Sequence, residues 1–116
     1  MQRIVTFGEI LLRLSPPSHL RLTQATSFDL YFGCAEANVA ASLAKFGLPV
    51  KFITAVPPNE LGESSLSMLR SFGVEPFALI QGKRLGIYYF EHGASERPGK
   101  VVYDREDSSF STLKKG

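Results

Sequence analysis

The segment 33–40, which reads GCAEANVA, combines residue types that suit the binding of a small molecule rich in hydroxyl groups. Small residues form a turn that leads into an alanine-rich helix, with Glu36 and Asn38 at its start. Gly33 lets a ligand approach the backbone closely because it has no side chain. The first turn of a helix leaves backbone N–H groups free, and the Asn38 carboxamide both donates and accepts hydrogen bonds. This segment therefore predicts the polar floor of a ligand pocket.

The other polar residues do not form a recognisable catalytic centre. The chain has no glycine-rich loop that ends in Gly-Lys-Ser or Gly-Lys-Thr. Its single cysteine excludes an internal disulfide and a cysteine cluster for zinc, and neither histidine has a partner at metal-ligand spacing. We therefore expect no catalytic residue and no metal site in this chain. The candidate carboxylates, none of which its neighbours mark as a base, are Glu9, Asp29, Glu36, Asp104 and Asp107.

The pocket needs elements that hold it in place, and the hydrophobic pattern predicts an α/β core. Apolar and small residues recur at helical spacing in two segments, and Gly47 and Gly73 end these helices. In the second helix, Leu66, Leu69 and Phe72 are expected to face inward. Because strands and helices alternate, we expect parallel βαβαβ winding with right-handed crossovers. The expected core elements are strands 4–7, 50–56 and 76–80 and helices 36–46 and 61–72.

A second set of short strands flanks this core in the sequence, and we expect it to form a separate small sheet. Its strands are expected at 10–14, 20–22, 28–32, 85–91 and 100–103. The expected division is therefore a core of about 2–9 and 33–82, strands of the small sheet at about 10–32 and 83–105, and a tail of 106–116. We expect the tail to be poorly ordered, because only Phe110 and Leu113 could anchor it.

Composition excludes several classes of partner. The chain has 116 residues, of which 44% are hydrophobic, and its net charge is +2 with scattered lysines and arginines. This composition is ordinary for one soluble globular domain and does not indicate a nucleic-acid partner. No segment has transmembrane length, and the apolar run at the N-terminus is too short for a signal peptide. We therefore expect a cytoplasmic protein that binds neither nucleic acid nor membrane.

The segment 33–40 resembles the first signature of the ribokinase-like (PfkB) carbohydrate kinases, in the form found in the 2-keto-3-deoxygluconate kinase branch. The resemblance extends over nearly the whole chain through Gly8-Glu9, LGIY at 85–88, Arg97-Pro98 and KVVYDR at 100–105. It implies the N-terminal part of a ribokinase-like fold, in which a β lid covers the sugar. The implied reaction transfers the γ-phosphate of ATP, with Mg²⁺, to 2-keto-3-deoxygluconate or a similar sugar acid.

The family's nucleotide site and its catalytic aspartate, in a Gly-Ala-Gly-Asp motif, belong to a C-terminal half that these residues do not include. The resemblance therefore implies that the chain alone binds sugar weakly, binds neither ATP nor Mg²⁺, and catalyses no turnover.

The resemblance also implies roles for individual residues. Asn38 would donate or accept a hydrogen bond with a sugar hydroxyl, and Tyr88 would lie on the substrate. Tyr103 and Arg105 would face the acid end, where a guanidinium can hold a carboxylate with two charge-assisted hydrogen bonds. The pocket floor would be shaped by Gly33, Cys34, Ala35, Glu36 and Ala37.

Simpler interpretations of these residues stay open. Asn38 could cap local backbone, and Glu36 could be a helix-start charge that the helix dipole favours. Tyr88 could be a half-buried strand aromatic, and Arg105 an exposed arginine on an edge strand.

Three departures from the family pattern bear on the substrate. Cys34 replaces the second glycine of the signature, which narrows the pocket floor. Pro57-Pro58 stands where many members have Gly-Asp, and we expect it to tighten the loop over the substrate. Glu106 and Asp107 would place negative charge beside Arg105 and weaken the binding of an acid.

Two other functions remain as alternatives. The chain could derive from a kinase of a neutral sugar, such as a fructokinase. It could also be a non-catalytic interaction fragment that forms a homodimer through the exposed edges of the lid.

Overall fold

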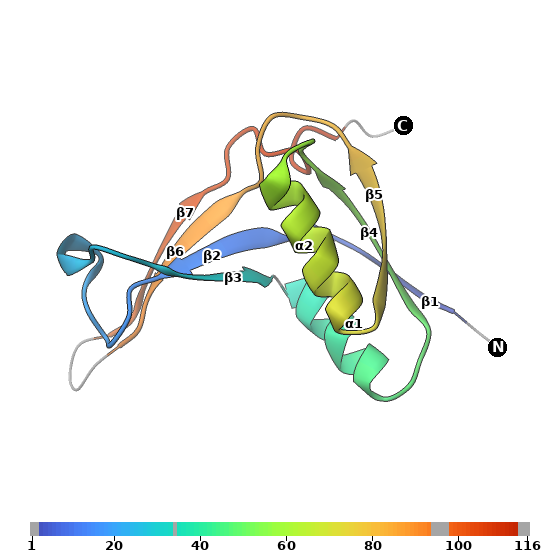
Figure 1. The fold of residues 1–116 in the computed structure, drawn as a ribbon, viewed down its shortest axis with the longest axis horizontal. Coiled ribbons are helices and arrows are strands. Elements are labelled where there is room, and N and C mark those ends of the chain that lie inside the picture. The colour runs from blue at the N-terminus through green and yellow to red at the C-terminus, as the bar shows by residue number, and fades with distance from the viewer. Residues whose placement is uncertain (1–2, 34, 94–97, 114–116) are drawn as a thin grey trace.

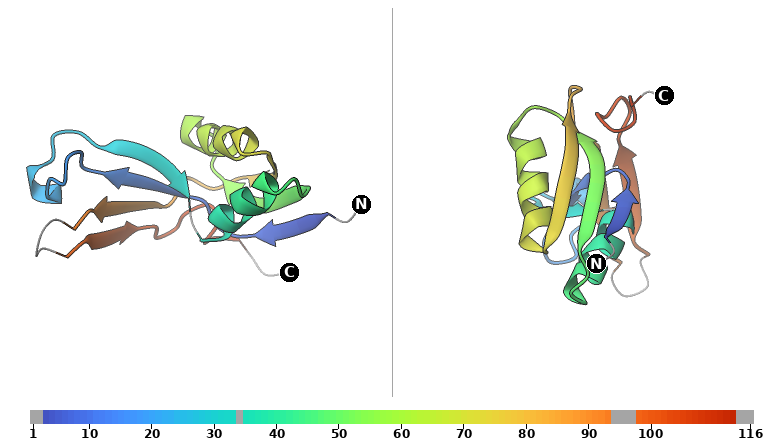
Figure 2. Two further views of the ribbon diagram at one scale, coloured as in Figure 1. Left: turned by 90° about the horizontal axis from the view of Figure 1, so that it is seen from below. Right: turned by 90° about the vertical axis from the view of Figure 1, so that its right-hand side faces the viewer.

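The computed structural model describes residues 3–33, 35–93 and 98–113. These residues form two β-sheets and two α-helices with their connecting segments (Figure 1). One sheet carries the helices and forms the core. The other extends away from it as a lid (Figure 2). The expected α/β architecture is therefore confirmed. In the described ranges, no helix is long and apolar enough to cross a membrane.

The core sheet is parallel and has the strand order β1-β4-β5. Parallel neighbours need a long crossover connection, and helices α1 and α2 occur in these connections. The alternation expected for a βαβαβ unit is thus present. The bounds are β1 (Ile4–Phe7), α1 (Ala35–Lys45), β4 (Val50–Val56), α2 (Glu60–Ser71) and β5 (Val74–Ile80).

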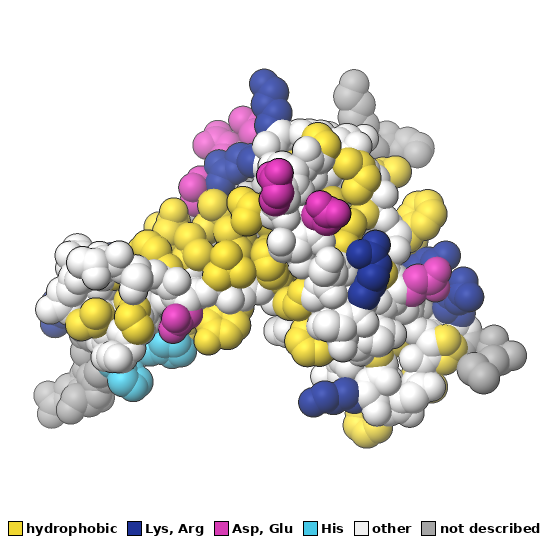
Figure 3. Space-filling view, viewed as in Figure 1, with side chains coloured by type: hydrophobic (Ala, Val, Ile, Leu, Met, Phe, Trp, Pro, Cys, Tyr) yellow, Lys and Arg dark blue, Asp and Glu magenta, His cyan; other side chains and the backbone are white. Residues whose placement is uncertain are grey.

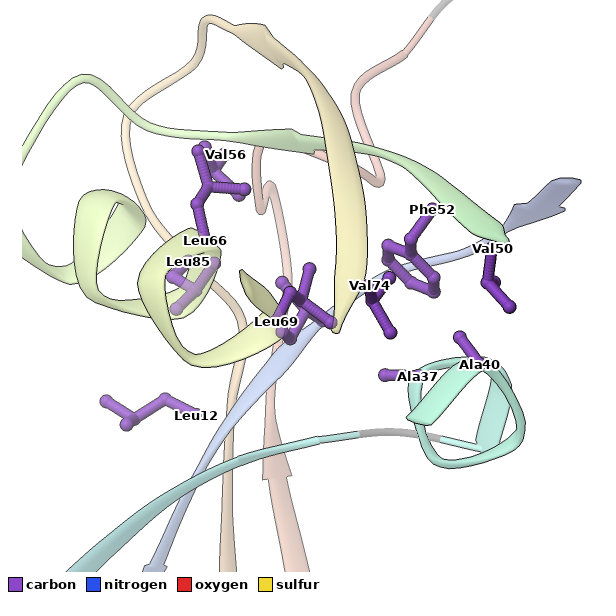
Figure 4. Close-up of a cluster of buried hydrophobic side chains, with 11 residues drawn as sticks. Leu12, Ala37, Ala40, Val50, Phe52, Val56, Leu66, Leu69, Val74 and Leu85 are labelled. Carbon is purple, nitrogen blue, oxygen red and sulfur yellow. The ribbon is translucent and has the colours of Figure 1, made fainter. Parts of the chain in front are cut away.

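Both helices pack on the same face of the core sheet. Ala37 and Ala40 of α1 point toward the sheet, where Phe52 is fully buried (Figure 4). Leu66 and Leu69 of α2 join the same cluster, as the helical spacing predicts. The prediction that Phe72 also faces inward is wrong. Phe72 follows the last helical residue with φ −92° and ψ 5°, so it leaves the helical period and is about half exposed.

The opposite face of the core sheet is largely uncovered in the described residues. It carries alternate residues of the two outer strands, because successive side chains of a strand point to opposite faces. Phe7 and Phe77 are 58% and 53% exposed there. Val5 and Leu79 share this face and are also exposed.

The lid is a four-stranded mixed sheet with the order β3-β2-β6-β7. Strands β2 and β6 are parallel, whereas the outer pairs are antiparallel. Its strands come from two distant parts of the sequence, as expected. They are β2 (Leu11–Ser15), β3 (Asp29–Gly33), β6 (Ile87–Glu91) and β7 (Lys100–Asp104).

The strand expected at 20–22 is wrong, because this segment leads into a short 3₁₀ helix, η1 (Leu22–Gln24). The Arg21 backbone N–H donates to the Gln24 side-chain oxygen at 2.9 Å, and the Gln24 N–H donates to the Arg21 carbonyl at 2.9 Å. These local bonds satisfy backbone groups that a strand would pair with a neighbour.

The tail was expected to be poorly ordered, but the structure contradicts this expectation for residues 106–113, which pack against the rest of the chain. Ser108 and Ser109 are each 1% exposed, and the Ser109 N–H donates to the Arg84 carbonyl at 2.8 Å. The Phe110 ring lies 5.2 Å from the Phe7 ring, between centroids. The tail is therefore anchored mainly by serine hydrogen bonds, which hydrophobic periodicity cannot reveal.

Candidate functional site

A cleft of about 590 Å³ lies where the core sheet, the start of α1 and the lid meet. The core contributes Gly8 and Glu9, which follow β1. Ligand sites in open α/β sheets lie beyond the carboxyl ends of the strands, and this cleft has that position at β1. The residues predicted from sequence that line it are Ala35, Glu36, Asn38, Tyr88, Tyr103 and Arg105.

The other three predicted residues have different outcomes. Gly33 lines a smaller hollow of about 150 Å³ that shares Asn38 and Tyr88 with the cleft. Cys34 lies outside the described residues, so its effect on the pocket floor stays a prediction. Ala37 does not shape the floor, because it is 3% exposed and packs into the hydrophobic core below α1. It supports the start of the helix from the core side.

The start of α1 lies tightly against the end of β1. A Cβ atom at Gly8 would come within 2.9 Å of the Glu36 Cβ, so only glycine allows this approach. Among the described residues, the Asn38 side chain makes no hydrogen bond, although Asn38 lines both the cleft and the side hollow. It therefore does not cap local backbone there, and its donor and acceptor groups are available to a ligand.

A buried carboxylate holds the lid and the tail to the core at one end of the cleft. Glu9 is 6% exposed in its side chain, and its Oε1 accepts a hydrogen bond from Nη2 of Arg105. Its Oε2 accepts from the Ser108 hydroxyl at 2.6 Å. A buried charge is costly unless it is paired and hydrogen-bonded, and both oxygens of Glu9 meet that condition.

The same contacts explain the segment after Arg105. The Ser108 N–H donates to the Arg105 carbonyl at 3.2 Å, so Glu106 and Asp107 are the middle residues of a turn. Asp107 has φ 56°, in the left-handed region. This turn brings Ser108 to Glu9. Among the described residues, the ion-pair partner of Arg105 is Glu9, not the two acidic residues that follow it in sequence.

Sequence reasoning missed the role of Glu9, which was one of five carboxylates without an assigned function. Its position could have indicated this role, because Glu9 follows the first strand directly and belongs to the Gly8-Glu9 motif that resembles the family. The partner groups lie 96 and 99 residues away, so no local pattern joins them.

Gly86 lets the lid pass close to this carboxylate. A Cβ atom there would lie 2.7 Å from Glu9 Oε2 and 3.0 Å from the Arg105 Cβ. Leu85 precedes it and is buried in the core cluster. The motif at 85–88 thus sets the crossing from core to lid and leads into Tyr88.

One row of side chains crosses the lid from edge to edge. In the strand registers, Arg13 pairs with both Tyr31 and Tyr88, and Tyr88 pairs with Tyr103. Directly paired residues share one face of a sheet, so the row is Tyr31, Arg13, Tyr88 and Tyr103. The Tyr88 and Tyr103 rings lie 6.0 Å apart, and the Arg105 guanidinium lies 6.0 Å from the Tyr103 ring.

The loop at Pro57-Pro58 does not line the cleft, contrary to the expectation that it tightens over the substrate. Both prolines line a separate hollow at the start of α2. Asn59 caps that helix, since its Oδ1 accepts from the Gly62 N–H at 3.0 Å. The loop therefore serves the start of the helix.

The described residues do not form a magnesium or zinc site. Within 3–33, 35–93 and 98–113, no three side chains of histidine, cysteine, aspartate or glutamate lie together in a group that could hold a metal ion. The cleft itself offers Glu9 and Glu36, and Glu9 is already engaged by Arg105 and Ser108.

Comparison with known proteins gives a consistent result. Residues 1–115 match the family described as pfkB family carbohydrate kinase. The chain is 38% identical over 112 residues to the 2-dehydro-3-deoxygalactonokinase of Haloferax volcanii, covering 96% of the chain and 35% of that protein. It is 29% identical over 111 residues to the 2-dehydro-3-deoxygluconokinase of Bacillus subtilis, covering 94% of the chain and 34% of that protein.

The structure agrees closely with that of a 2-dehydro-3-deoxygluconokinase from Thermotoga maritima. The TM-score is 0.95 at 53% sequence identity, covering 98% of this chain and 35% of that one. The chain therefore spans about a third of the length of the relatives that it matches.

Proposed function

Because this chain belongs to the pfkB family of carbohydrate kinases, we propose that its cleft binds a sugar acid of the 2-keto-3-deoxygluconate class. This compound is the same as the 2-dehydro-3-deoxygluconate in the names of two relatives. The observation that carries the proposal is the convergence of Asn38, Tyr88, Tyr103 and Arg105 on one cleft from separate elements.

The lining supplies the contacts that such a ligand needs. Asn38 and the backbone at the start of α1 suit sugar hydroxyls, which both donate and accept hydrogen bonds. Tyr88 and Tyr103 form an aromatic wall on the lid side. Arg105 is 48% exposed, and one nitrogen binds Glu9, so its other N–H groups remain to hold the acid end. Glu9 thereby fixes the orientation of the guanidinium.

In the proposed reaction, ATP supplies the γ-phosphate, and Mg²⁺ would neutralise its charge during transfer. The described residues do not fit a magnesium site, so we assign them no step with the metal. We propose that this chain contributes the part of the active site that holds the acceptor sugar. In this proposal the nucleotide site and the base belong to residues outside this chain.

A neutral sugar is the second candidate, and the charges of the cleft favour it. The charged groups that line the cleft are Glu9, Glu36 and Arg105. Their net charge is one negative charge. A net negative lining disfavours a carboxylate ligand. A kinase of a neutral ketose such as fructose would not have this conflict.

We also propose that two copies of the chain pair through their lids. Apolar side chains gather over the lid (Figure 3), and Phe28, Leu30 and Val102 are exposed on one face of it. Strands β3 and β7 are edge strands, with backbone groups that a second sheet can pair. A homodimer would cover both features, and sedimentation of the purified chain tests it.

The ligand class is tested by calorimetry on the purified chain with 2-keto-3-deoxygluconate and with fructose. We expect the acid to bind more tightly. Arg105→Ala should lower the affinity for the acid about tenfold or more and change the affinity for fructose far less, because a charge-assisted contact is lost.

Arg84→Ala is the matched control, since Arg84 also forms an ion pair, with Asp104, but does not line the cleft. A preference of the unmodified chain for fructose would overturn the sugar-acid assignment.

A further inference from the structure

Arg13 lies in the centre of the lid row and has no role in the function proposed above. It pairs in register with Tyr31 on one side and Tyr88 on the other. Neighbouring strands lie about 4.8 Å apart, so its Cα lies roughly 10 Å from that of Tyr103, two strands away. It lines the side hollow together with Asn38 and Tyr88, which also line the main cleft.

The positive charge of Arg13 is not paired with a carboxylate among the described residues. Its guanidinium carbon lies 4.4 Å from the centre of the Tyr31 ring and 5.8 Å from that of Phe90. These aromatic contacts orient a cation without neutralising it. The buried Nε has no hydrogen-bond partner, and in the described residues Arg13 forms no ion pair.

The other arginines near the cleft are compensated. Arg105 is paired with Glu9, and Arg84 is paired with Asp104 at 3.0 Å. With Glu36 exposed in the cleft, the main lining has an excess negative charge. Arg13 is therefore the cation of the lid row that can offset this charge for a ligand lying against Asn38 and Tyr88.

We propose that Arg13 is a specificity-determining residue that makes the cleft prefer an anionic sugar over a neutral one. It acts by its uncompensated charge in the side hollow that shares Asn38 and Tyr88 with the cleft, whereas Arg105 acts in the cleft by a directed contact. The side hollow of about 150 Å³ has roughly the volume of five water molecules at ~30 Å³ each, so it can take a carboxylate group but not a whole sugar. This inference rests on the sugar-binding function proposed above.

The test measures the ratio of affinities for 2-keto-3-deoxygluconate and fructose by calorimetry at low salt. Arg13→Gln should lower this ratio about tenfold, with the affinity for fructose changed less than about twofold, because a charge several ångströms away acts on the anion alone. Arg13→Lys should retain most of the ratio, and added salt should reduce the ratio of the unmodified chain.

Arg70→Gln on α2 removes the same charge from an exposed site outside the cleft and the side hollow. It should leave the ratio unchanged. An unchanged ratio in Arg13→Gln, or a loss in Arg13→Lys as large as in Arg13→Gln, would overturn the role of charge at Arg13. Neither result would affect the proposed function, which fails only if the unmodified chain does not prefer the acid.

A measurement on the unmodified chain covers the case in which Arg13→Gln does not fold. The Nε–H resonance of Arg13, assigned by its absence in Arg13→Lys, should shift on titration with the acid and stay in place with fructose. If the acid shifts the Arg105 resonance and leaves that of Arg13 in place, the inference is wrong.

Discussion

Glu9 joins the end of the first core strand to two segments that lie far from it in the sequence. Its carboxylate accepts hydrogen bonds from Arg105 at the end of the lid and from Ser108 in the tail. The contact with Arg105 fixes one predicted ligand residue, and the contact with Ser108 fixes the tail, whose Phe110 lines the cleft. A single buried charge thus positions both the site and the segment that follows it.

The hydrogen bond from Ser108 can be tested by Ser108→Ala. The change leaves Glu9 Oε2 without this donor in a site where Ser108 is 1% exposed. Leaving a buried polar group unsatisfied costs about 1–3 kcal/mol, and we expect the free energy of unfolding in urea to fall by that amount.

Ser27→Ala provides the comparison, because Ser27 is exposed and makes no hydrogen bond through its side chain among the described residues. It should change the free energy of unfolding by less than about 0.5 kcal/mol. Equal effects of the two substitutions would show that Ser108 does not stabilise the buried carboxylate.

At the scale of an element, α2 shows how a helix start is built by its loop rather than by helix propensity. A Cβ atom on Gly62 would overlap the Pro57 carbonyl oxygen, so Pro57 lies directly against the first turn of the helix. Asn59 completes the start by capping the Gly62 N–H. The loop that family resemblance associated with the substrate is therefore occupied in holding this helix.

Gly62→Ala tests this arrangement. We expect it to lower the free energy of unfolding, although alanine in place of glycine usually raises it in a helix. Alanine normally favours a helix over glycine by about 1 kcal/mol. Here the methyl group would meet the Pro57 carbonyl, and overpacking typically costs about 1–3 kcal/mol, so we expect a net loss of unfolding free energy in urea.

Ser67→Ala, on an exposed position of the same helix, should be neutral or slightly stabilising. A stabilising Gly62→Ala would contradict the close contact between the loop and the first turn.

At the scale of the whole molecule, a cleft lined by most of the predicted sugar-binding residues forms within a chain that spans about a third of the length of its relatives. The cleft needs only the end of β1, the start of α1 and the lid, and all three lie in this chain. The outer face of the core sheet remains apolar and exposed at Val5, Phe7, Phe77 and Leu79. Such a surface is normally covered in a soluble protein.

We predict that the purified chain releases no ADP when ATP, Mg²⁺ and 2-keto-3-deoxygluconate are added. Phosphoryl transfer needs a clamp for the donor phosphates and a positioned base, and the role proposed for the described cleft is to hold the acceptor sugar alone. A coupled ADP assay measures the outcome. Turnover that rises with chain concentration and disappears in Asn38→Ala would refute the prediction, because a contaminating kinase would not respond to that substitution.

Local patterns predicted most elements of the fold. The limits of β4 match the expected 50–56, and α1 and α2 lie within one or two residues of their expected bounds. These elements have clear hydrophobic periodicity and glycines with φ 82° at their ends, at Gly47 and Gly73. The segment 20–22 has no such periodicity, and its local hydrogen bonds decided a 3₁₀ helix instead.

The sequence by itself determined the family, the α/β architecture and most of the residues around the cleft, because these depend on periodicity and on short motifs with fixed spacing. Only the tertiary structure decided that Ala37 faces the core, that Glu9 holds Arg105 and Ser108, and that Arg13 stands between Tyr31 and Tyr88. The contacts of Ala37 and Glu9 depend on how segments far apart in the sequence pack together, and the neighbours of Arg13 depend on which strands pair. Pairing between β2 and β6 joins residues more than 70 positions apart, and no local pattern specifies such a register.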